Sequence, residues 1–320
     1  MKNKRPLIIS SGDPAGIGLE LVQKAWEVLR GKVLFAVMAD QNHVQGPVTE
    51  IKNLNELTGN EAHLPVLHHS FTSPAILGDP SLNNSQNIVD VIKKCVNLVL
   101  NGEASALCTL PINKNNLRKG CNFLYSGHTD FLEAITKAKK AVMMLSCSEL
   151  RVVPVTVHIG LSKIVPELTK ELIIKTIRVT ERSLINNFSL PSPRIFVAGL
   201  NPHAGEAGMM GTEEINIISP AIQTLFNEGM NVTGPYSPDS MFHAKARLKY
   251  DVAICMYHDQ ALIPLKTIDF SKSVNITLGL PIIRTSPDHG TAYDIAGKGI
   301  ADPSSLIQAI MTANQMSQNI

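Results

Sequence analysis

Three histidines of this sequence each follow directly after a short apolar run that is typical of a buried strand. His158, His203 and His258 all stand beside Gly, Pro or Asp at that position. Because ligands of open α/β sheets bind beyond the carboxyl ends of the strands, these three side chains can converge at one sheet edge. Three neutral imidazoles suit a divalent transition metal that keeps an open position for water or substrate. The pattern therefore predicts a metal site. Five other histidines fit an ordinary surface or core role, namely His43, His63, His68, His69 and His243.

Two carboxylates accompany these histidines. Asp259 adjoins His258, and Asp239 lies in the Pro- and Gly-rich segment 234–240. Each could fix the tautomer of an imidazole by accepting a hydrogen bond, or could accept a proton during a reaction. Capping of a local turn is the alternative role, and for Asp239 it is equally well supported.

A second polar set has the composition of an anion site. Lys266, Asn275 and Arg284 follow one another at intervals of nine residues, and the last two are embedded in apolar sequence that Gly and Pro interrupt. A planar guanidinium together with an ammonium suits a substrate that carries phosphate or carboxylate. Surface salt bridges are the alternative, but an unpaired charge would be costly to bury in such apolar surroundings.

His128 and Thr129 belong to a compact polar turn, 126–130, that precedes an expected helix from about residue 131. The start of a helix offers free backbone amides to an anion, and these two side chains could add further donors to the same ligand. Alternatively, Thr129 or Ser126 serves only as the helix cap.

The glycine-rich segment 12–18 stands between an expected strand and an expected helix. Gly16 and Gly18, with Asp40 at the end of the next strand, partly match a dinucleotide-binding loop. Leu21 replaces the third glycine of that fingerprint. The alternative is a tight strand-to-helix turn in which glycine provides positive φ and a helix start.

Apolar runs and amphipathic segments alternate along the whole chain, which predicts an α/β fold with a mainly parallel sheet. The expected buried strands cover 7–10, 33–39, 104–107, 152–157, 194–198 and 252–256. The expected helices cover 19–29, 88–100, 170–186 and 215–228. The segment 50–85, which is rich in Pro, Asn and Ser, is expected to be an irregular surface excursion.

Composition excludes several classes of protein. The 320 residues are 44% hydrophobic and 18% charged, and the formal net charge is only +2, which argues against a nucleic-acid partner. No apolar run approaches the roughly 18 to 20 residues that cross a bilayer, and no export signal is recognisable. The five cysteines form no C-x-x-C pair. We therefore expect a cytoplasmic protein with reduced thiols, most of them buried, and with two domains.

Taken in order, the motifs resemble those of one family, the 4-hydroxythreonine-4-phosphate dehydrogenases (PdxA family) of pyridoxal phosphate biosynthesis. The resemblance runs almost end to end. It is carried by Gly-Asp-Pro-Ala-Gly-Ile-Gly at 12–18, Ser-Gly-His-Thr at 126–129, Gly-Leu-Asn-Pro-His-Ala-Gly-Glu at 199–206, Met-Tyr-His-Asp-Gln at 256–260, Asn-Ile-Thr-Leu-Gly-Leu-Pro at 275–281 and Arg-Thr-Ser-Pro-Asp-His-Gly-Thr-Ala at 284–292.

This resemblance implies an NAD- or NADP-dependent oxidation of 4-phosphohydroxy-L-threonine at its C3 hydroxyl. The product, 2-amino-3-oxo-4-phosphooxybutanoate, would then decarboxylate to 3-amino-2-oxopropyl phosphate. It further implies that His158, His203 and His258 bind one divalent metal ion, zinc, magnesium or cobalt. The implied substrate ligands are His128, Thr129, Lys266, Asn275 and Arg284. The candidates for accepting the hydroxyl proton are Lys266, Asp239 and Asp259, in no firm order.

The implied fold is similar to that of isocitrate and isopropylmalate dehydrogenases, with two α/β/α domains, a cleft between them and a homodimer whose subunits share active sites. We expect residues 1–126 and 285–320 to form the first domain. Residues 127–284 would form the second domain and would carry most of the metal and substrate ligands.

Other activities fit parts of the same pattern. Related dehydrogenases act on 4-phosphothreonate or 4-phosphoerythronate, and Leu110 stands where the family usually has Gly. A metal-dependent aldolase or hydrolase would use the histidines without nicotinamide. A phospho-ligand sensor with a two-domain cleft would need an anion site but not the three loop histidines.

Overall fold

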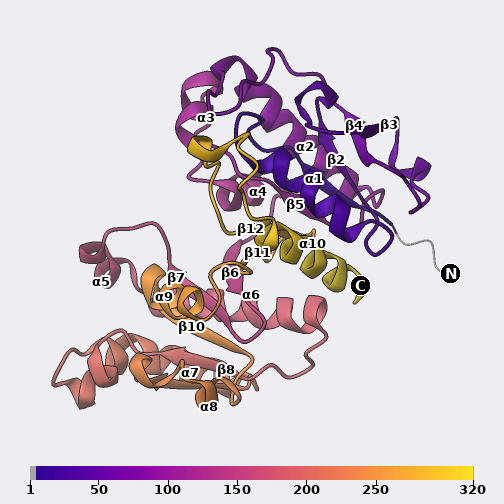
Figure 1. Cartoon of the computed structure of the whole chain (residues 1–320). Coiled ribbons are helices and arrows are strands. Elements are labelled where there is room, and N and C mark those ends of the chain that lie inside the picture. The colour runs from indigo at the N-terminus through magenta and orange to yellow at the C-terminus, as the bar shows by residue number, and fades with distance from the viewer. Residues whose placement is uncertain (1–4, 320) are drawn as a thin grey trace. The chain divides into compact units, whose positions relative to one another are not determined.

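The computed structural model describes residues 5–319, and these form two compact units (Figure 1). The first unit contains residues 5–139 and 280–318, and the second contains 140–279. The observed boundaries differ from the expected ones, because 127–139 and 280–284 pack with the first unit rather than the second. His128, Thr129 and Arg284 therefore lie in the first unit. Residues 1–4 and 320 of the expected first domain lie outside the described residues.

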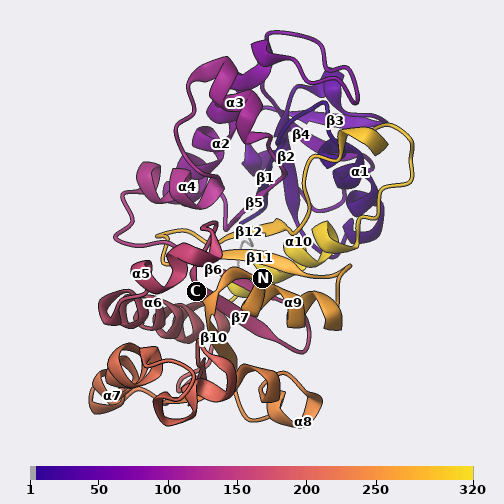
Figure 2. The same cartoon turned by 90° about the vertical axis from the view of Figure 1, so that its left-hand side faces the viewer.

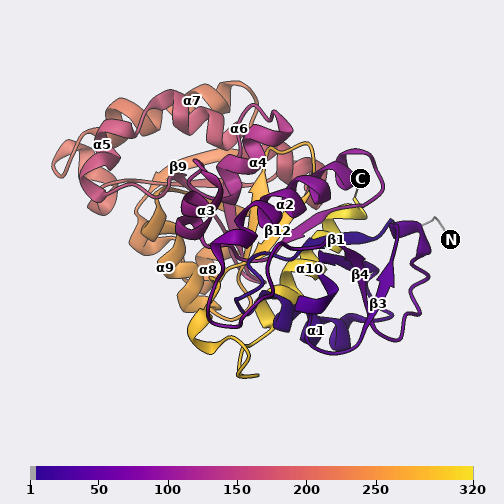
Figure 3. The ribbon, with the colours of Figure 1, turned by 90° about the horizontal axis from the view of Figure 1, so that it is seen from above.

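The strands of the first unit are all parallel to their neighbours, in the order β3-β4-β2-β1-β5-β12. Their bounds are β1 Leu7–Ser10, β2 Phe35–Ala39, β3 Val48–Ile51, β4 Leu64–His68, β5 Leu107–Thr109 and β12 Arg284–Pro287. The helices of this unit are α1 Gly18–Leu29, α2 Ser85–Leu100, α3 Lys114–Cys121, α4 His128–Thr136 and α10 Ser304–Ser317. Figure 3 shows α2 and α3 on one side of these strands and α1 and α10 on the other. The unit is therefore a three-layer α/β/α structure.

Helix α2 shows why these layers form. Ile88, Ile92 and Cys95 recur at helical spacing, and all three are buried. They pack in one apolar cluster with Ile8 of β1 and Leu107 of β5. Burying apolar side chains of this size contributes about 1.5 to 3 kcal/mol each, which is enough to hold the helix on the sheet.

The second unit contains a mixed set of strands, in the order β11-β6-β7-β10-β8-β9. Their bounds are β6 Val142–Ser146, β7 Arg151–Thr156, β8 Ile195–Ala198, β9 Val232–Tyr236, β10 Val252–Tyr257 and β11 Val274–Leu278. Strand β6 is antiparallel to β11 and β7, whereas β7, β10, β8 and β9 are parallel. The helices are α5 Ile164–Glu167, α6 Lys170–Phe188, α7 Ser219–Asn227, α8 Ala244–Arg247 and α9 His258–Ile268. Figure 2 shows α6 and α9 on opposite sides of β7 and β10.

The predicted α/β class is confirmed, and three of the five cysteines, Cys95, Cys108 and Cys255, are buried as expected. The expectation that 50–85 is irregular is wrong for its middle, because β4 lies there and pairs with both β3 and β2. The sequence does not predict this strand because it contains Pro65, and proline is rare inside strands. It lies opposite Thr49 of β3, and the pairing with β2 begins only at the following residue.

The glycine-rich turn 12–18 packs tightly against residue 291. The Ile17 amide donates to the Thr291 carbonyl at 3.0 Å, and a Cβ on Gly16 would lie 2.6 Å from the same oxygen. Gly12 has a φ of +62°. These glycines are thus explained by a close backbone approach and a positive φ, which favours the tight-turn interpretation.

No helix in the part of the chain that the structure describes is long and apolar enough to cross a membrane.

Candidate active site

The three loop histidines follow three neighbouring parallel strands of the second unit. His158 comes two residues after β7, His258 directly after β10, and His203 in the loop after β8. The strand order β7-β10-β8 places these carboxyl ends side by side. Adjacent strands are roughly 4.8 Å apart, so short loops from neighbouring strands can bring side chains into contact.

His158 and His258 come close to each other. Their ring centroids are 5.8 Å apart. With metal–nitrogen distances of about 2.0 to 2.1 Å, two imidazoles that share one ion have ring centroids roughly 5 to 6 Å apart. The observed separation therefore fits two ligands of one metal ion.

Asp259 holds the ring of His258. Its Oδ1 lies 2.6 Å from His258 Nδ1. A carboxylate can only accept a hydrogen bond, so Nδ1 must be the donor and Nε2 is left available as a metal ligand. Asp259 therefore has the geometry of a residue that fixes the imidazole tautomer.

His203 lies in a backbone segment of unusual conformation, η5 (Pro202–Gly208). The five residues from His203 to Ala207 all have positive φ, with values of 50° and 52° at His203 and Ala204. His158 also has a positive φ, 55°. Left-handed helical backbone costs roughly 1 to 2 kcal/mol for each residue with a Cβ. Strain of this kind is concentrated at functional sites, which supports a role for both histidines beyond packing.

The described residues of this chain do not bring all three imidazoles into one cluster. Among residues 5–319, no three His, Cys, Asp or Glu side chains lie close enough together to hold a metal ion. His203 lies instead near Asp239, whose pKa is lowered by a hydrogen bond from Ser237 and further by the positive charge of His203 when protonated. The predicted three-histidine site therefore stays a prediction.

A groove runs along α9 and contains three of the predicted residues. It has a volume of about 440 Å³ and is lined by His258, Asp259, Leu262, Ile263, Lys266 and Thr267. The Lys266 ammonium lies 5.2 Å from the centroid of the Phe270 ring. One helix thus presents an imidazole, a carboxylate and an ammonium to the same open groove.

Two buried side chains hold the loop after β8, and one of them also links it to the end of β10. Gln260 accepts from the Met256 amide at 2.6 Å and donates to the Gly199 carbonyl at 2.8 Å. Glu214, which begins the short π-helical turn η6 (Glu214–Ile218), accepts from the Leu200 and Asn201 amides at 2.7 Å each. The segments that carry His203 and His258 are therefore tied to each other through the end of β8.

The first unit contains a separate group of cationic side chains. Arg284 of β12 is buried and donates to Thr109 Oγ1 through Nε and Nη2, at 3.1 and 2.6 Å. Burial lowers its pKa to about 10, so it stays charged at neutral pH. Burial also lowers the pKa of His128 well below its usual value, and the charges of Arg284 and Lys114 lower it further. His128 is thus neutral beside two cations.

The His128 ring leaves one polar atom buried without a partner. Its Nε2 has no hydrogen-bond partner in the described residues, and neither does Asn275 Oδ1 on β11 of the second unit. Buried polar atoms are nearly always paired, so unpaired ones call for a ligand or water. Thr129 is the second residue of α4, where backbone amides are also free.

Two residues of these groups were not predicted from the sequence. Lys114 begins α3, and its Nζ would lie 3.8 Å from a Cβ on Gly127, at the start of α4. Glu214 is 3% exposed although it carries a charged side chain. Lys114 is one of many lysines, and nothing in the sequence distinguishes Glu214 from its exposed neighbours. Only the fold identifies them.

Histidines and carboxylates at the carboxyl edge of parallel strands are the arrangement of an α/β enzyme. The chain belongs to the family described as pyridoxal phosphate biosynthetic protein PdxA, whose model matches residues 21–313. The predicted family membership is therefore confirmed.

Individual relatives match over nearly the whole chain. A 4-hydroxythreonine-4-phosphate dehydrogenase of Roseobacter denitrificans is 50% identical over 98% of this chain and 97% of its own length. One of Ruegeria sp. is 47% identical over the same shares. The crystal structure of a 4-hydroxythreonine-4-phosphate dehydrogenase from Klebsiella pneumoniae superimposes with a TM-score of 0.90, at 34% identity, and covers 98% of this chain and 100% of that one.

Proposed function

We propose that this protein is a 4-hydroxythreonine-4-phosphate dehydrogenase of pyridoxal phosphate biosynthesis. The observation that carries the proposal is the 50% identity, over 98% of the chain, with a relative of that name. The reaction would transfer a hydride from C3 of the substrate to the nicotinamide of NAD or NADP, while the hydroxyl proton passes to a base. The resulting 3-oxo acid would lose carbon dioxide by cleavage of its C1–C2 bond, and C2 would gain a proton to give 3-amino-2-oxopropyl phosphate.

His158, His203 and His258 are the proposed ligands of one divalent metal ion, zinc, magnesium or cobalt. The separation of the His158 and His258 rings and the hydrogen bond from His258 to Asp259 support this donor set. A bound cation of this kind acts as a Lewis acid, which lowers the pKa of a coordinated hydroxyl and favours its oxidation. Because the three rings do not meet within one described chain, a homodimer with shared sites is part of the proposal.

The proposed substrate ligands fall in both units. Lys266 and Asn275 belong to the second unit, and His128, Thr129 and Arg284 belong to the first. The cationic group around Arg284 suits a doubly charged phosphate, and we add Lys114 to it because its ammonium lies beside the start of α4. Neutral His128 can donate a further hydrogen bond from Nε2 without adding charge.

The three candidates for the proton acceptor have different surroundings. Asp259 is engaged with the His258 ring, so we assign it to holding that ring. Asp239 is exposed, and its lowered pKa makes it a weak base. Lys266 lines the α9 groove together with His258, which supports a role close to the proposed metal. We therefore propose Lys266, acting as the neutral amine, before Asp239 as the acceptor of the hydroxyl proton.

A coupled spectrophotometric assay tests the proposal. Purified protein with a divalent ion is mixed with NAD or NADP and with phosphohydroxythreonine, phosphothreonate or phosphoerythronate in parallel. We expect formation of reduced nicotinamide and of carbon dioxide with phosphohydroxythreonine, and loss of turnover in chelator. Preference for one of the sugar acids would replace the proposed substrate, and turnover unaffected by chelation would refute the metal. Product formation without reduced nicotinamide would point instead to an aldolase or hydrolase.

A further inference from the structure

Glu214 is a buried carboxylate that binds backbone rather than a cation. Its Oε1 accepts from the amides of Leu200 and Asn201 at 2.7 Å each, and its Oε2 accepts from Asn201 Nδ2 at 2.9 Å. The side chain is 3% exposed, and within residues 5–319 no Lys, Arg or His nitrogen lies within 4.0 Å of it. Burying a charge is costly unless hydrogen bonds satisfy it, so these three bonds must hold the segment firmly.

Three glycines make room for this carboxylate and its partner Asn201. A Cβ on Gly199 would lie 3.0 Å from Glu214 Oε1, and one on Gly205 would lie 2.6 Å from Oε2. A Cβ on Gly211 would lie 2.3 Å from Asn201 Nδ2. The backbone before the left-handed turn and within it thus closes around the Glu214 carboxylate, and the backbone after the turn closes around its partner Asn201.

The hydrogen bonds of Glu214 lie directly before the turn that carries His203. Leu200 and Asn201 are the last residues before η5, and His203 is the second residue of that turn. Of the five residues of this run, all but Gly205 carry a Cβ, so the left-handed conformation is strained at four of them. A strained turn needs contacts that hold it, and Glu214 bonds to the residues directly before the turn and lies close to Gly205 within it.

We infer that Glu214 is a positioning residue, which holds the left-handed turn 203–207 so that His203 points its imidazole toward the metal. This inference rests on the proposed function, since it assumes that His203 is a metal ligand. The carboxylate of Glu214 accepts its hydrogen bonds from Leu200 and Asn201. It acts through the amides of Leu200 and Asn201 and through the space that Gly205 leaves.

Glu213 provides a matched control. It is the preceding residue, carries the same charge and also accepts from Asn201 Nδ2, at 2.7 Å. It is only partly buried and holds no backbone amide of the segment 199–208 in the described contacts. Substitution of either residue by glutamine removes a negative charge and changes a hydrogen bond with the Asn201 side chain. Only substitution of Glu214 affects the hydrogen bonds from the Leu200 and Asn201 amides.

The test compares Glu214→Ala, Glu214→Gln and Glu213→Gln in the full-length protein with two measurements. Amide hydrogen exchange reports the order of segment 199–208 without metal. Titration with Co²⁺, followed by its visible absorption, reports the affinity and geometry of the site. We expect Glu214→Ala to speed exchange in 199–208 and to weaken Co²⁺ binding by at least about tenfold, the usual effect of losing a residue that orients a metal ligand.

The conservative variants separate positioning from general folding. Glutamine keeps an oxygen for the Leu200 and Asn201 amides, so Glu214→Gln should recover most of the affinity and the wild-type spectrum, and Glu213→Gln should resemble the wild type. Unchanged Co²⁺ affinity in Glu214→Ala, or an equal loss in Glu213→Gln, would overturn the inference. If the wild type binds no Co²⁺, the metal proposal fails, and the exchange measurement alone decides whether Glu214 orders the turn.

Discussion

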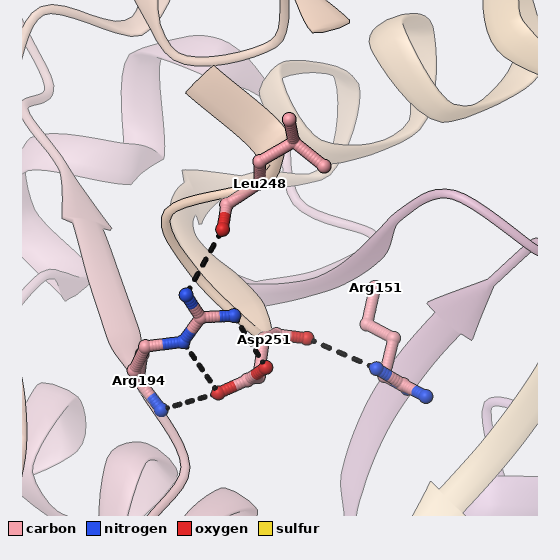
Figure 4. A network of polar contacts seen from close by, with 4 residues as sticks. All are labelled: Arg151, Arg194, Leu248 and Asp251. Atoms are coloured by element: carbon pink, nitrogen blue, oxygen red, sulfur yellow. Dashed lines mark hydrogen bonds and ion pairs between the residues drawn. The ribbon is translucent and has the colours of Figure 1, made fainter. Parts of the chain in front are cut away.

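The two ends of the parallel strands β7, β10 and β8 differ in how their side chains are used. At the amino ends, Arg194 donates to the Asp251 carboxylate from its backbone amide and from Nε and Nη2, at 2.7 to 3.1 Å, and to the Leu248 carbonyl at 2.9 Å (Figure 4). Arg151 donates to the Asp251 carbonyl at 3.3 Å. At the carboxyl ends of the same strands stand His158, His258 and the loop of His203.

The network of Arg194 and Asp251 at the amino ends of the strands has the features of one that stabilises the fold. Burial tends to raise the pKa of Asp251, but the hydrogen bonds from Arg194 outweigh it and hold the pKa below its usual value. The charges are paired with each other. At the carboxyl edge the backbone of His158 and His203 is left-handed, and a buried carboxylate is used to hold a loop. Stability is thus concentrated at one end of the strands, and strain at the other.

The largest effect on turnover is expected when an imidazole is removed from the carboxyl ends of these strands. His203→Ala should lower turnover by about 1000-fold or more, because a lost metal ligand removes several kcal/mol of charge stabilisation. The free energy of unfolding should change little, since His203 is exposed. Steady-state kinetics and urea denaturation measure the two quantities on one preparation.

His243→Ala is the control for this change, because His243 is an exposed histidine of the same unit outside the three loops. It should keep wild-type turnover. Full activity of His203→Ala with added metal would remove His203 from the site.

The next largest effect is expected in the α9 groove. Lys266→Ala should raise the KM for the phosphorylated substrate by about 10- to 100-fold, which corresponds to the 1.5 to 3 kcal/mol of a hydrogen bond to a charged group. It should also lower kcat, because Lys266 is the proposed proton acceptor. The KM for the nicotinamide cofactor should stay the same. Lys272→Ala, an exposed lysine just beyond the helix, provides the control. Equal changes in both KM values would mean that Lys266 does not act on the substrate.

The sequence predicts the α/β class and the loops that carry the histidines, because both depend on local patterns. Strand β1 is found at its observed bounds, and β8 and β10 within one residue at each end. The prediction misses β4, because proline is rare inside strands and Pro65 therefore argues against one at this position. It also misses β6 and β11, whose antiparallel pairing depends on contacts between segments more than 120 residues apart.

The site is predictable only in part for a similar reason. The histidines stand beside Gly, Pro and Asp, and these neighbours mark them in the sequence. Glu214 and Lys114 have no such neighbours, because their roles arise from partners that are distant along the chain or from burial. The group of His128, Arg284 and Thr109 likewise joins three segments that only the fold brings together.

A third experiment tests the amino edge. Asp251→Ala should lower the free energy of unfolding by about 1 to 2 kcal/mol, because it removes charge-assisted hydrogen bonds that solvent partly screens. Turnover should be unchanged, since Asp251 lies at the far ends of the strands from the histidines. Glu228→Ala, which breaks an exposed pair with Arg178 that solvent screens, should lower it less than Asp251→Ala does. A smaller effect for Asp251 than for Glu228 would contradict a stabilising role of this network.

The contribution of Asp251 also has a definite pH dependence. Because its pKa is lower in the folded than in the unfolded protein, it stabilises the fold fully above the unfolded value of about 3.9. The contribution is lost as the pH falls through the folded value. The difference in unfolding free energy between wild type and Asp251→Ala should therefore be constant near neutrality and shrink below about pH 4. Urea denaturation at a series of pH values measures it.

The smallest predicted effect separates strain from chemistry at the carboxyl edge. His203→Gly and His203→Ala both remove the imidazole, so both should be inactive, but only glycine adopts a φ of 50° without a steric penalty. His203→Gly should therefore be more stable than His203→Ala by about 1 kcal/mol. The same pair of substitutions at Lys163, whose φ is −97°, should favour alanine instead. If glycine is no better than alanine at position 203, the left-handed turn stores no strain, and the contrast between the two strand ends then rests on charge pairing alone.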